Sequence, residues 1–166
     1  MRREQINELA LTAVLTALAL IIGVVESLIP PIFPMLPYVR IGLSNVVVLF
    51  CVVAVSYRSA TAVTVIKSIL VPIFLGNPMM FAYSITGSIF ALIVTIILIK
   101  CRISMILVSA FSAIAHSVGQ LIIACFFGGT AQVLLLLPYF ALISLASGSL
   151  VGILVIYLLK KLPSKQ

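Results

Sequence analysis

The segment SMILVSAFSAIAHSVGQLIIACFF, residues 104–127, combines the length of a membrane-spanning helix with a row of polar side chains. A helix needs about 20 apolar residues to cross the hydrocarbon core of a bilayer. Successive residues on a helix turn by about 100°, so positions i, i+3, i+7 and i+11 share one stripe. The polar positions on that stripe are Ser109, Ser112, His116 and Gln120. We therefore predict a spanning helix with a lipid-facing side and a polar, inward-facing side.

The rest of the chain is equally apolar. Of its 166 residues, 64% are hydrophobic and 8% are charged, and the mean hydropathy is +1.40. Soluble domains carry about 25% charged residues, and a soluble chain of this size cannot bury so much apolar surface in one core. We expect an all-α integral membrane protein that forms a single six-helix transmembrane domain over residues 1–166. The first apolar run exceeds a usual signal-peptide core, so it is interpreted as a span.

The order of spans and charges predicts the topology. The six candidate spans are 9–29, 41–57, 60–76, 81–99, 104–126 and 132–159. The second and third are short and lie beside proline and glycine, which suggests broken or re-entrant helices that line a cavity. Basic residues favour cytoplasmic connections. With the N-terminus inside, all basic residues except Arg40 and Lys67 lie on the cytoplasmic side. This places both termini in the cytoplasm and the protein in the plasma membrane, and it accounts for the net charge of +7 without a nucleic-acid partner.

Three ionisable residues fall inside or beside the predicted spans: Glu26, Arg40 and Lys67. An ionisable group in a bilayer costs several kcal/mol unless it is paired or hydrated. The predicted topology puts these groups between mid-membrane and the outer surface. The uncharged polar residues at similar depth are Asn45, Asn77, His116, Gln120 and Gln132. Together they predict a hydrated substrate pocket that opens to the outside.

The polar residues have structural explanations as well. His116 and Gln120 are consistent with an interhelical hydrogen-bond clamp, with ligand contact or with a proton relay. Lys67 shares a helix face with Thr64 and Ser68. It is consistent with a buried ion pair to Glu26 or with contact to an anionic ligand. The sequence leaves these alternatives open.

The first span carries two small-residue faces. One consists of Ala10, Ala13 and Ala17, and the other of Thr12, Thr16, Ala19, Gly23 and Glu26. A helix at the edge of a bundle needs only one close-packed face. The additional face, which contains Ala13 and Ala17, therefore predicts a partner helix that docks from outside. The abundance of alanine in membrane helices is the alternative explanation. In the last span, the GxxxG pair Gly148 and Gly152 is interpreted as internal packing.

Several catalytic motifs are absent from the sequence. There is no Walker A motif for ATP hydrolysis, and the three acidic residues are all glutamates, so no aspartate-rich magnesium motif is present. Cys51, Cys101 and Cys125 show no metal-binding or disulfide spacing. We expect neither catalysis by this chain alone, nor a cofactor, nor a bound metal.

Four stretches resemble one family: LALTAVLTALALII (9–22), RIGLSNVVVLF (40–50), TGSIFALIVTIIL (86–98) and SAIAHSVGQLIIA (112–124). They resemble the Gx transporter family, whose members are often labelled heptaprenyl diphosphate synthase component I. That family is similar to the substrate-binding S components of energy-coupling-factor (ECF) importers. The resemblance implies six helices, both termini inside and an outward pocket. It also implies that an AxxxA motif, here Ala13 to Ala17, docks onto a transmembrane coupling protein.

Two functions follow as expectations. The first is an S-component-like subunit that captures a small anionic or amphipathic nutrient, an isoprenoid or quinone precursor among the classes the resemblance implies. It would bind through Lys67 and Arg40, with hydrogen bonds from Asn45, Asn77, His116 and Gln120, and work with a coupling protein and two ATPases. The second is a membrane subunit that assists a soluble prenyl diphosphate synthase. A self-sufficient transporter is the third possibility, and the identity of the partners discriminates among them.

Overall fold

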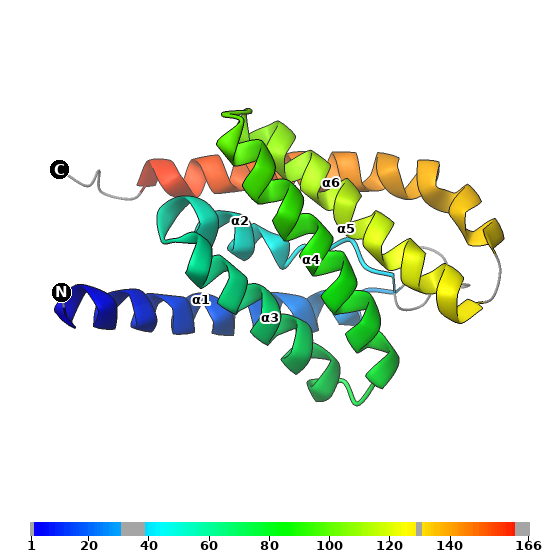
Figure 1. Cartoon of the computed structure of the whole chain (residues 1–166), viewed down its shortest axis with the longest axis horizontal. Coiled ribbons are helices and arrows are strands. Elements are labelled where there is room, and N and C mark those ends of the chain that lie inside the picture. Colours follow the sequence, from blue (N-terminus) through cyan, green and yellow to red (C-terminus); the bar gives the residue numbers. More distant parts are fainter. Residues whose placement is uncertain (1, 31–38, 129–130, 162–166) are drawn as a thin grey trace.

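The computed structural model describes residues 2–30, 39–128 and 131–161, which are helical throughout apart from short connections and contain no strand. The helices are α1 (Arg2–Leu28), α2 (Asn45–Ala54), α3 (Tyr57–Phe74), α4 (Pro78–Lys100), α5 (Met105–Gly128), the 3-10 helix η1 (Ala131–Leu136) and α6 (Leu137–Lys161). Figure 1 shows the first turn of α1 and the last turn of α6 at the same end of the bundle. The predicted all-α fold is confirmed. Most of the proline-rich stretch IPPIFPMLP, residues 29–37, lies outside the described ranges.

Five helical segments of the described chain are long and apolar enough to cross a membrane: α1, α3, α4, α5 and η1 with α6. The third segment, predicted as 60–76, is one continuous helix of 18 residues, Tyr57–Phe74. At about 1.5 Å per residue, 18 residues extend about 27 Å, close to the thickness of the hydrocarbon core. The chain is therefore built as an integral membrane protein.

The prediction of six spans is wrong by one. Helix α2 has ten residues instead of the predicted 41–57. Ten residues extend only about 15 Å, half of a bilayer core. Before α2, Gly42 has φ +84, which a helix cannot contain. After α2, the Ser56 side chain accepts from the Ser59 amide and starts α3. The segment is thus the broken helix that its glycine suggested. The predicted span was too long because hydropathy does not register a left-handed turn or a helix cap.

Small residues let α5 and α6 approach closely. A Cβ atom added to Gly148 would lie 2.7 Å from the Cα atom of Ala110, and one added to Gly152 would lie 2.8 Å from the Cα atom of Ile106. Such distances are well inside van der Waals contact, so neither glycine can be replaced without moving the backbone. The interpretation of this GxxxG pair as internal packing is confirmed.

The short helix α2 is the centre of the apolar core. Its valines pack with Cys51, Val63 from α3, Val108 from α5 and Val155 from α6. Figure 1 shows α2 in the half of the bundle that also contains the start of α1 and the end of α6. A smaller apolar cluster, centred on Leu121 and Phe140, packs α5 against α6. Glu26 lies in the last turn of α1, so the charged residues described next are away from the end that contains the termini.

Candidate ligand-binding cavity

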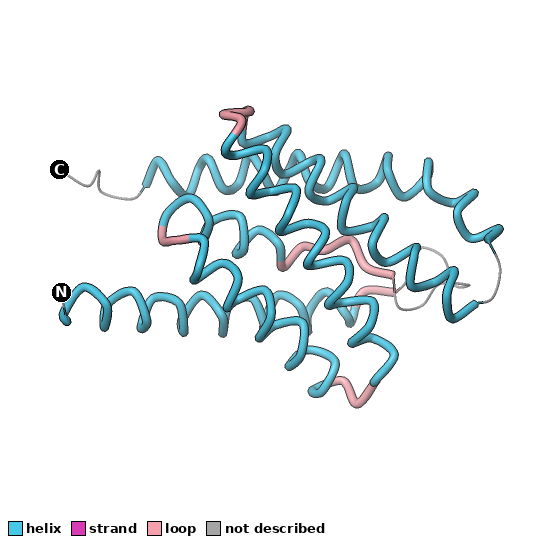
Figure 2. Tube along the Cα trace, in the orientation of Figure 1, coloured by secondary structure: helices cyan, strands magenta, loops and turns pink. Residues whose placement is uncertain are grey.

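The loop formed by residues 39–44 enters α2 from inside the bundle, and Figure 2 shows it passing between the helices. Non-helical backbone at membrane depth needs internal hydrogen-bond partners, because lipid offers none. The amide of Arg40 donates to Oε1 of Gln120 at 3.0 Å. The amide of Gly42 donates to Oε1 of Glu26. Polar side chains from α5 and α1 therefore hold this loop in place.

Lys67 reaches the start of α2 from α3 and is 3% exposed. Its ammonium group donates to Oγ of Ser44 at 2.9 Å and to Oδ1 of Asn45 at 2.6 Å. Both partners are neutral, and no carboxylate in the described ranges pairs with Lys67 within hydrogen-bond distance. The ion pair with Glu26 that the sequence left open is therefore not formed. Lys67 keeps a positive charge that neutral oxygens solvate but do not compensate.

His116 and Gln120 pair within α5 rather than between helices. The Nε2 atoms of the two side chains are 3.0 Å apart. Because Oε1 of Gln120 accepts from Arg40, its amide nitrogen faces the imidazole and donates to it. The proton of a neutral imidazole then resides on Nδ1, which is buried and has no hydrogen bond of ordinary geometry in the described structure. The pair is therefore not the interhelical clamp that the sequence left open, and Gln120 instead holds the loop at Arg40.

Two glycines form the slot for the imidazole ring. A Cβ atom at Gly87 of α4 would lie 2.9 Å from Nδ1 of His116, and one at Gly42 would lie 3.0 Å from its Cδ2. Gly42 also needs its positive φ to turn the chain into α2. The GLSN stretch of the sequence therefore supplies a turn, a wall of the imidazole slot and both oxygen partners of Lys67.

These side chains line one small cavity of about 30 Å³ between α1, α3, α4, α5 and the loop. Its charged and polar walls include Glu26, Arg40, Lys67, His116 and Gln120. Five of the predicted binding residues are thus brought together from four separate elements. The serines of α4 that also line it, Ser84 and Ser88, were missed by sequence reasoning. Their spacing of four residues in an otherwise apolar helix was the available signal.

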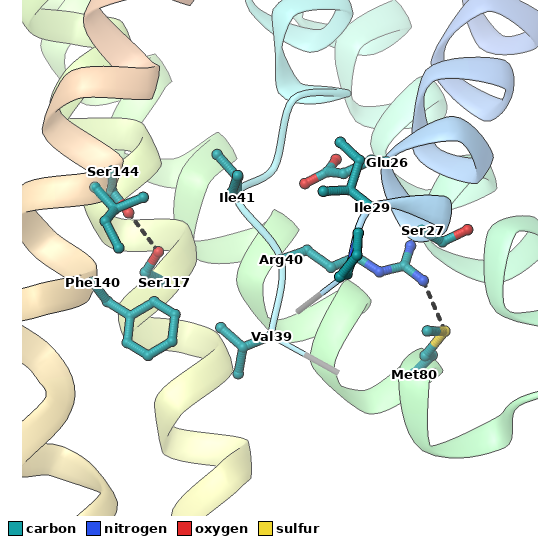
Figure 3. Close-up of a pocket in the computed structure, with 12 residues that line it drawn as sticks. Glu26, Ser27, Ile29, Val39, Arg40, Ile41, Met80, Ser117, Phe140 and Ser144 are labelled. Carbon is teal, nitrogen blue, oxygen red and sulfur yellow. Dashed lines mark hydrogen bonds between the residues drawn. The ribbon is translucent and has the colours of Figure 1, made fainter. Parts of the chain in front are cut away.

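Arg40 has weak neutral partners. One guanidinium nitrogen donates to the carbonyl of Gly23 at 3.3 Å, and the other is 2.8 Å from Sδ of Met80. A thioether is a poor acceptor for an ionised donor. Figure 3 shows the guanidinium directed at Met80, with the Glu26 carboxylate nearby. With Glu26 ionised, the cavity holds two cations and one carboxylate, which favours an anionic ligand.

Two predicted binding residues lie elsewhere. Asn77 does not line the cavity: its Oδ1 accepts from the amides of Met79 and Met80 at 3.1 and 3.4 Å and caps α4. An asparagine directly before a proline is a typical helix start, which the prediction overlooked. Asn45 bonds Lys67 but lines a neighbouring cavity of about 20 Å³, and its Nδ2 is buried without a partner in the described structure.

The two faces of α1 separate as the sequence suggested. Thr16, Ala19, Gly23 and Glu26 are buried against the bundle. Ala10, Ala13 and Ala17 are exposed. The face formed by Ala10, Ala13 and Ala17 is therefore open on the outside of the described bundle.

The comparisons with known proteins give one match. A family model described as heptaprenyl diphosphate synthase component I matches residues 15–158. No curated protein and no solved structure matches the chain significantly. The family identified from the GLSN and HSVGQ stretches is the family that the model describes.

Proposed function

Since the chain belongs to the heptaprenyl diphosphate synthase component I family, we propose that it is a membrane-embedded binding protein for a small anionic or amphipathic molecule. We further propose that it acts as the substrate-binding subunit of an ECF-type importer in the plasma membrane, with both termini in the cytoplasm. An isoprenoid or quinone precursor is the ligand class consistent with the family description. The importer would also contain a transmembrane coupling protein and two ATPases.

The observation that carries this proposal is the surplus of positive charge in the cavity, where two cations lie beside one carboxylate. Arg40 and Lys67 contact only neutral groups, and Glu26 is the carboxylate on the same walls. A buried charge without a counter-charge is unfavourable in a membrane, so a purely structural bundle gains nothing from this arrangement. A bound anion would supply the missing charge, and the imidazole and amide groups would orient it.

The open face of α1 supports a membrane partner. Ala13 and Ala17 are exposed and lie one helical turn apart, which permits close approach of a second helix. The chain carries no nucleotide-binding motif, so energy for transport would come from partners. These two features favour a coupled importer over a self-sufficient transporter.

The second candidate is a membrane subunit that assists a prenyl diphosphate synthase, and the description of the family favours it. In that role the two cations would hold a diphosphate. Prenyl transfer uses carboxylate clusters to bind magnesium, and the chain has three glutamates and no aspartate. We therefore expect the soluble partner, and not this chain, to perform any catalysis.

Ligand capture is tested by purifying the wild-type protein and Lys67→Met side by side and analysing the extracted small molecules by mass spectrometry. We expect an anionic compound that accompanies the wild type in stoichiometric amount and is lost from the variant. Equal recovery from both proteins would contradict the assignment of the cavity.

Partner identity separates the two candidates. The tagged protein is cross-linked in native membranes and the captured proteins are identified. A coupling protein with ATPases would support the importer, and a soluble prenyltransferase without ATPases would support the synthase subunit.

A further inference from the structure

A second pocket adjoins the charged cavity. The two share Glu26, Arg40 and Met80, and the second pocket has a volume of about 70 Å³. Its remaining walls are mainly apolar and come from α1, the 39–44 loop and α6. Figure 3 shows Phe140, Val39 and Ile41 on one side of this pocket, with the side chain of Arg40 extending away toward Met80. Arg40 therefore lies where a charged compartment meets an apolar one.

The serine hydroxyl groups in the apolar compartment form hydrogen bonds within the protein. The hydroxyl groups of Ser117 and Ser144 form a buried hydrogen bond of 2.7 Å. Ser27 donates to the carbonyl of Val24 within its own helix. Each of these hydroxyl groups already takes part in a hydrogen bond within the protein, so this part of the wall offers a ligand little polar contact. Phe140 and Ile143 supply its apolar side chains from α6.

The charge balance limits the head group of a ligand. With Glu26 ionised and accepting from the amide of Gly42, two cations face one anion. One additional negative charge makes the site neutral. A zwitterion would leave the site with its surplus positive charge, and a diphosphate would reverse the sign of the surplus. Both are unfavourable at membrane depth.

We propose that the two compartments form one site for a monoanion with a short apolar body. The proposal rests on the proposed function and specifies its ligand class. The anionic group lies between Lys67 and Arg40, and the apolar body lies along Ile41, Phe140 and Ile143. Arg40 contacts the ligand where its two parts join.

The test uses acetate, butyrate, hexanoate and octanoate, with the protein in lipid nanodiscs and empty nanodiscs as the blank. Calorimetry gives the dissociation constant for each. We expect affinity to rise about fourfold per methylene until the apolar compartment is full, which corresponds to about 0.8 kcal/mol for each buried CH₂. Neutral alcohols of equal length should bind at least tenfold more weakly. Pentanoate is added to the series as the C5 carboxylate, and isopentenyl diphosphate should bind more weakly than pentanoate.

A matched pair of variants locates the apolar body. Ile143→Trp fills the compartment from α6 and should abolish the dependence on chain length while leaving acetate binding unchanged. Leu142→Trp introduces the same side chain at the preceding residue, which is 67% exposed, and this variant should behave as the wild type.

Three results would overturn the proposal. Affinity independent of chain length in the wild type, or the same dependence in Ile143→Trp, would contradict the apolar compartment but leave the proposed anion binding intact. Tighter binding of isopentenyl diphosphate than of the C5 carboxylate would contradict the single charge. If no member of the series binds the wild type, or if Lys67→Met binds them equally, the proposed function fails as well.

Discussion

Lys67 is the single residue on which anion binding depends most directly. Replacement by methionine keeps the bulk of the stem and removes the charge, but it leaves Ser44 and Asn45 without their donor. An unpaired buried polar group costs about 1–3 kcal/mol, while removal of a desolvated charge offsets part of this. We expect Lys67→Met to remain folded and to lose binding of anionic ligands. Affinity and melting temperature are measured together. If Lys67→Met unfolds the protein, and Glu26→Gln added to it restores both fold and affinity, Lys67 is structural.

Gly87 tests whether the position of His116 matters for binding. A Cβ atom at this glycine would lie 2.9 Å from the imidazole and 3.0 Å from Cγ of Gln120. Gly87→Ala should displace both side chains and release the loop at Arg40, at a cost of about 1–3 kcal/mol in stability for overpacking. Gly128→Ala is the control, because open space surrounds that position, and its effect should stay within about 0.5 kcal/mol. Binding that is equally strong in both variants would exclude a role for the imidazole slot.

At the scale of the element, α1 packs one face against the bundle and exposes another on the outside. Ala13 and Ala17 are exposed, whereas Thr16 and Ala19 are buried. Leucine at position 13 or 17 should prevent close approach of a partner helix and reduce transport, or capture of the partner, at least tenfold. Ligand binding to the isolated protein should not change. Val14→Leu, at a residue 65% exposed, is the matched control. If leucine at position 13 abolishes ligand binding too, this face belongs to internal packing.

At the scale of the whole molecule, basic residues lie at the end of the bundle that contains both termini. The first turn of α1 and the last turn of α6 lie at one end, and Figure 1 shows the α2–α3 connection close to that end. The basic residues Arg3, Arg58, Lys160 and Lys161 belong to these segments, so the positive-inside rule predicts that this end faces the cytoplasm.

Single cysteines in a cysteine-free background test this orientation. An impermeant thiol reagent added to intact cells should label Pro78→Cys at the start of α4, and it should label Ser104→Cys, before α5, only after the membrane is permeabilised. The reverse pattern would invert the topology. It would also turn the cavity toward the cytoplasm, where a synthase partner would find it.

Composition and periodicity alone determined much about this protein. The scarcity of charge required a membrane environment, and the spacing of Ser109, Ser112, His116 and Gln120 placed these side chains on one face, which is buried. Both follow from properties that act along one helix: transfer of apolar residues into lipid and the helical repeat. The same reasoning separated the two faces of α1 and assigned Gly148 and Gly152 to internal packing.

Only the tertiary structure decided which polar groups meet. Lys67 pairs with Ser44 and Asn45 because a left-handed turn at Gly42 ends the loop and begins a half-length α2 beside α3. Gln120 binds the backbone of Arg40, 80 residues away. Asn77, equally polar in the sequence, caps its own helix instead. Hydropathy sums over residues without regard to direction, whereas a hydrogen bond depends on the position and angle of two groups, and the packing of separate helices determines both.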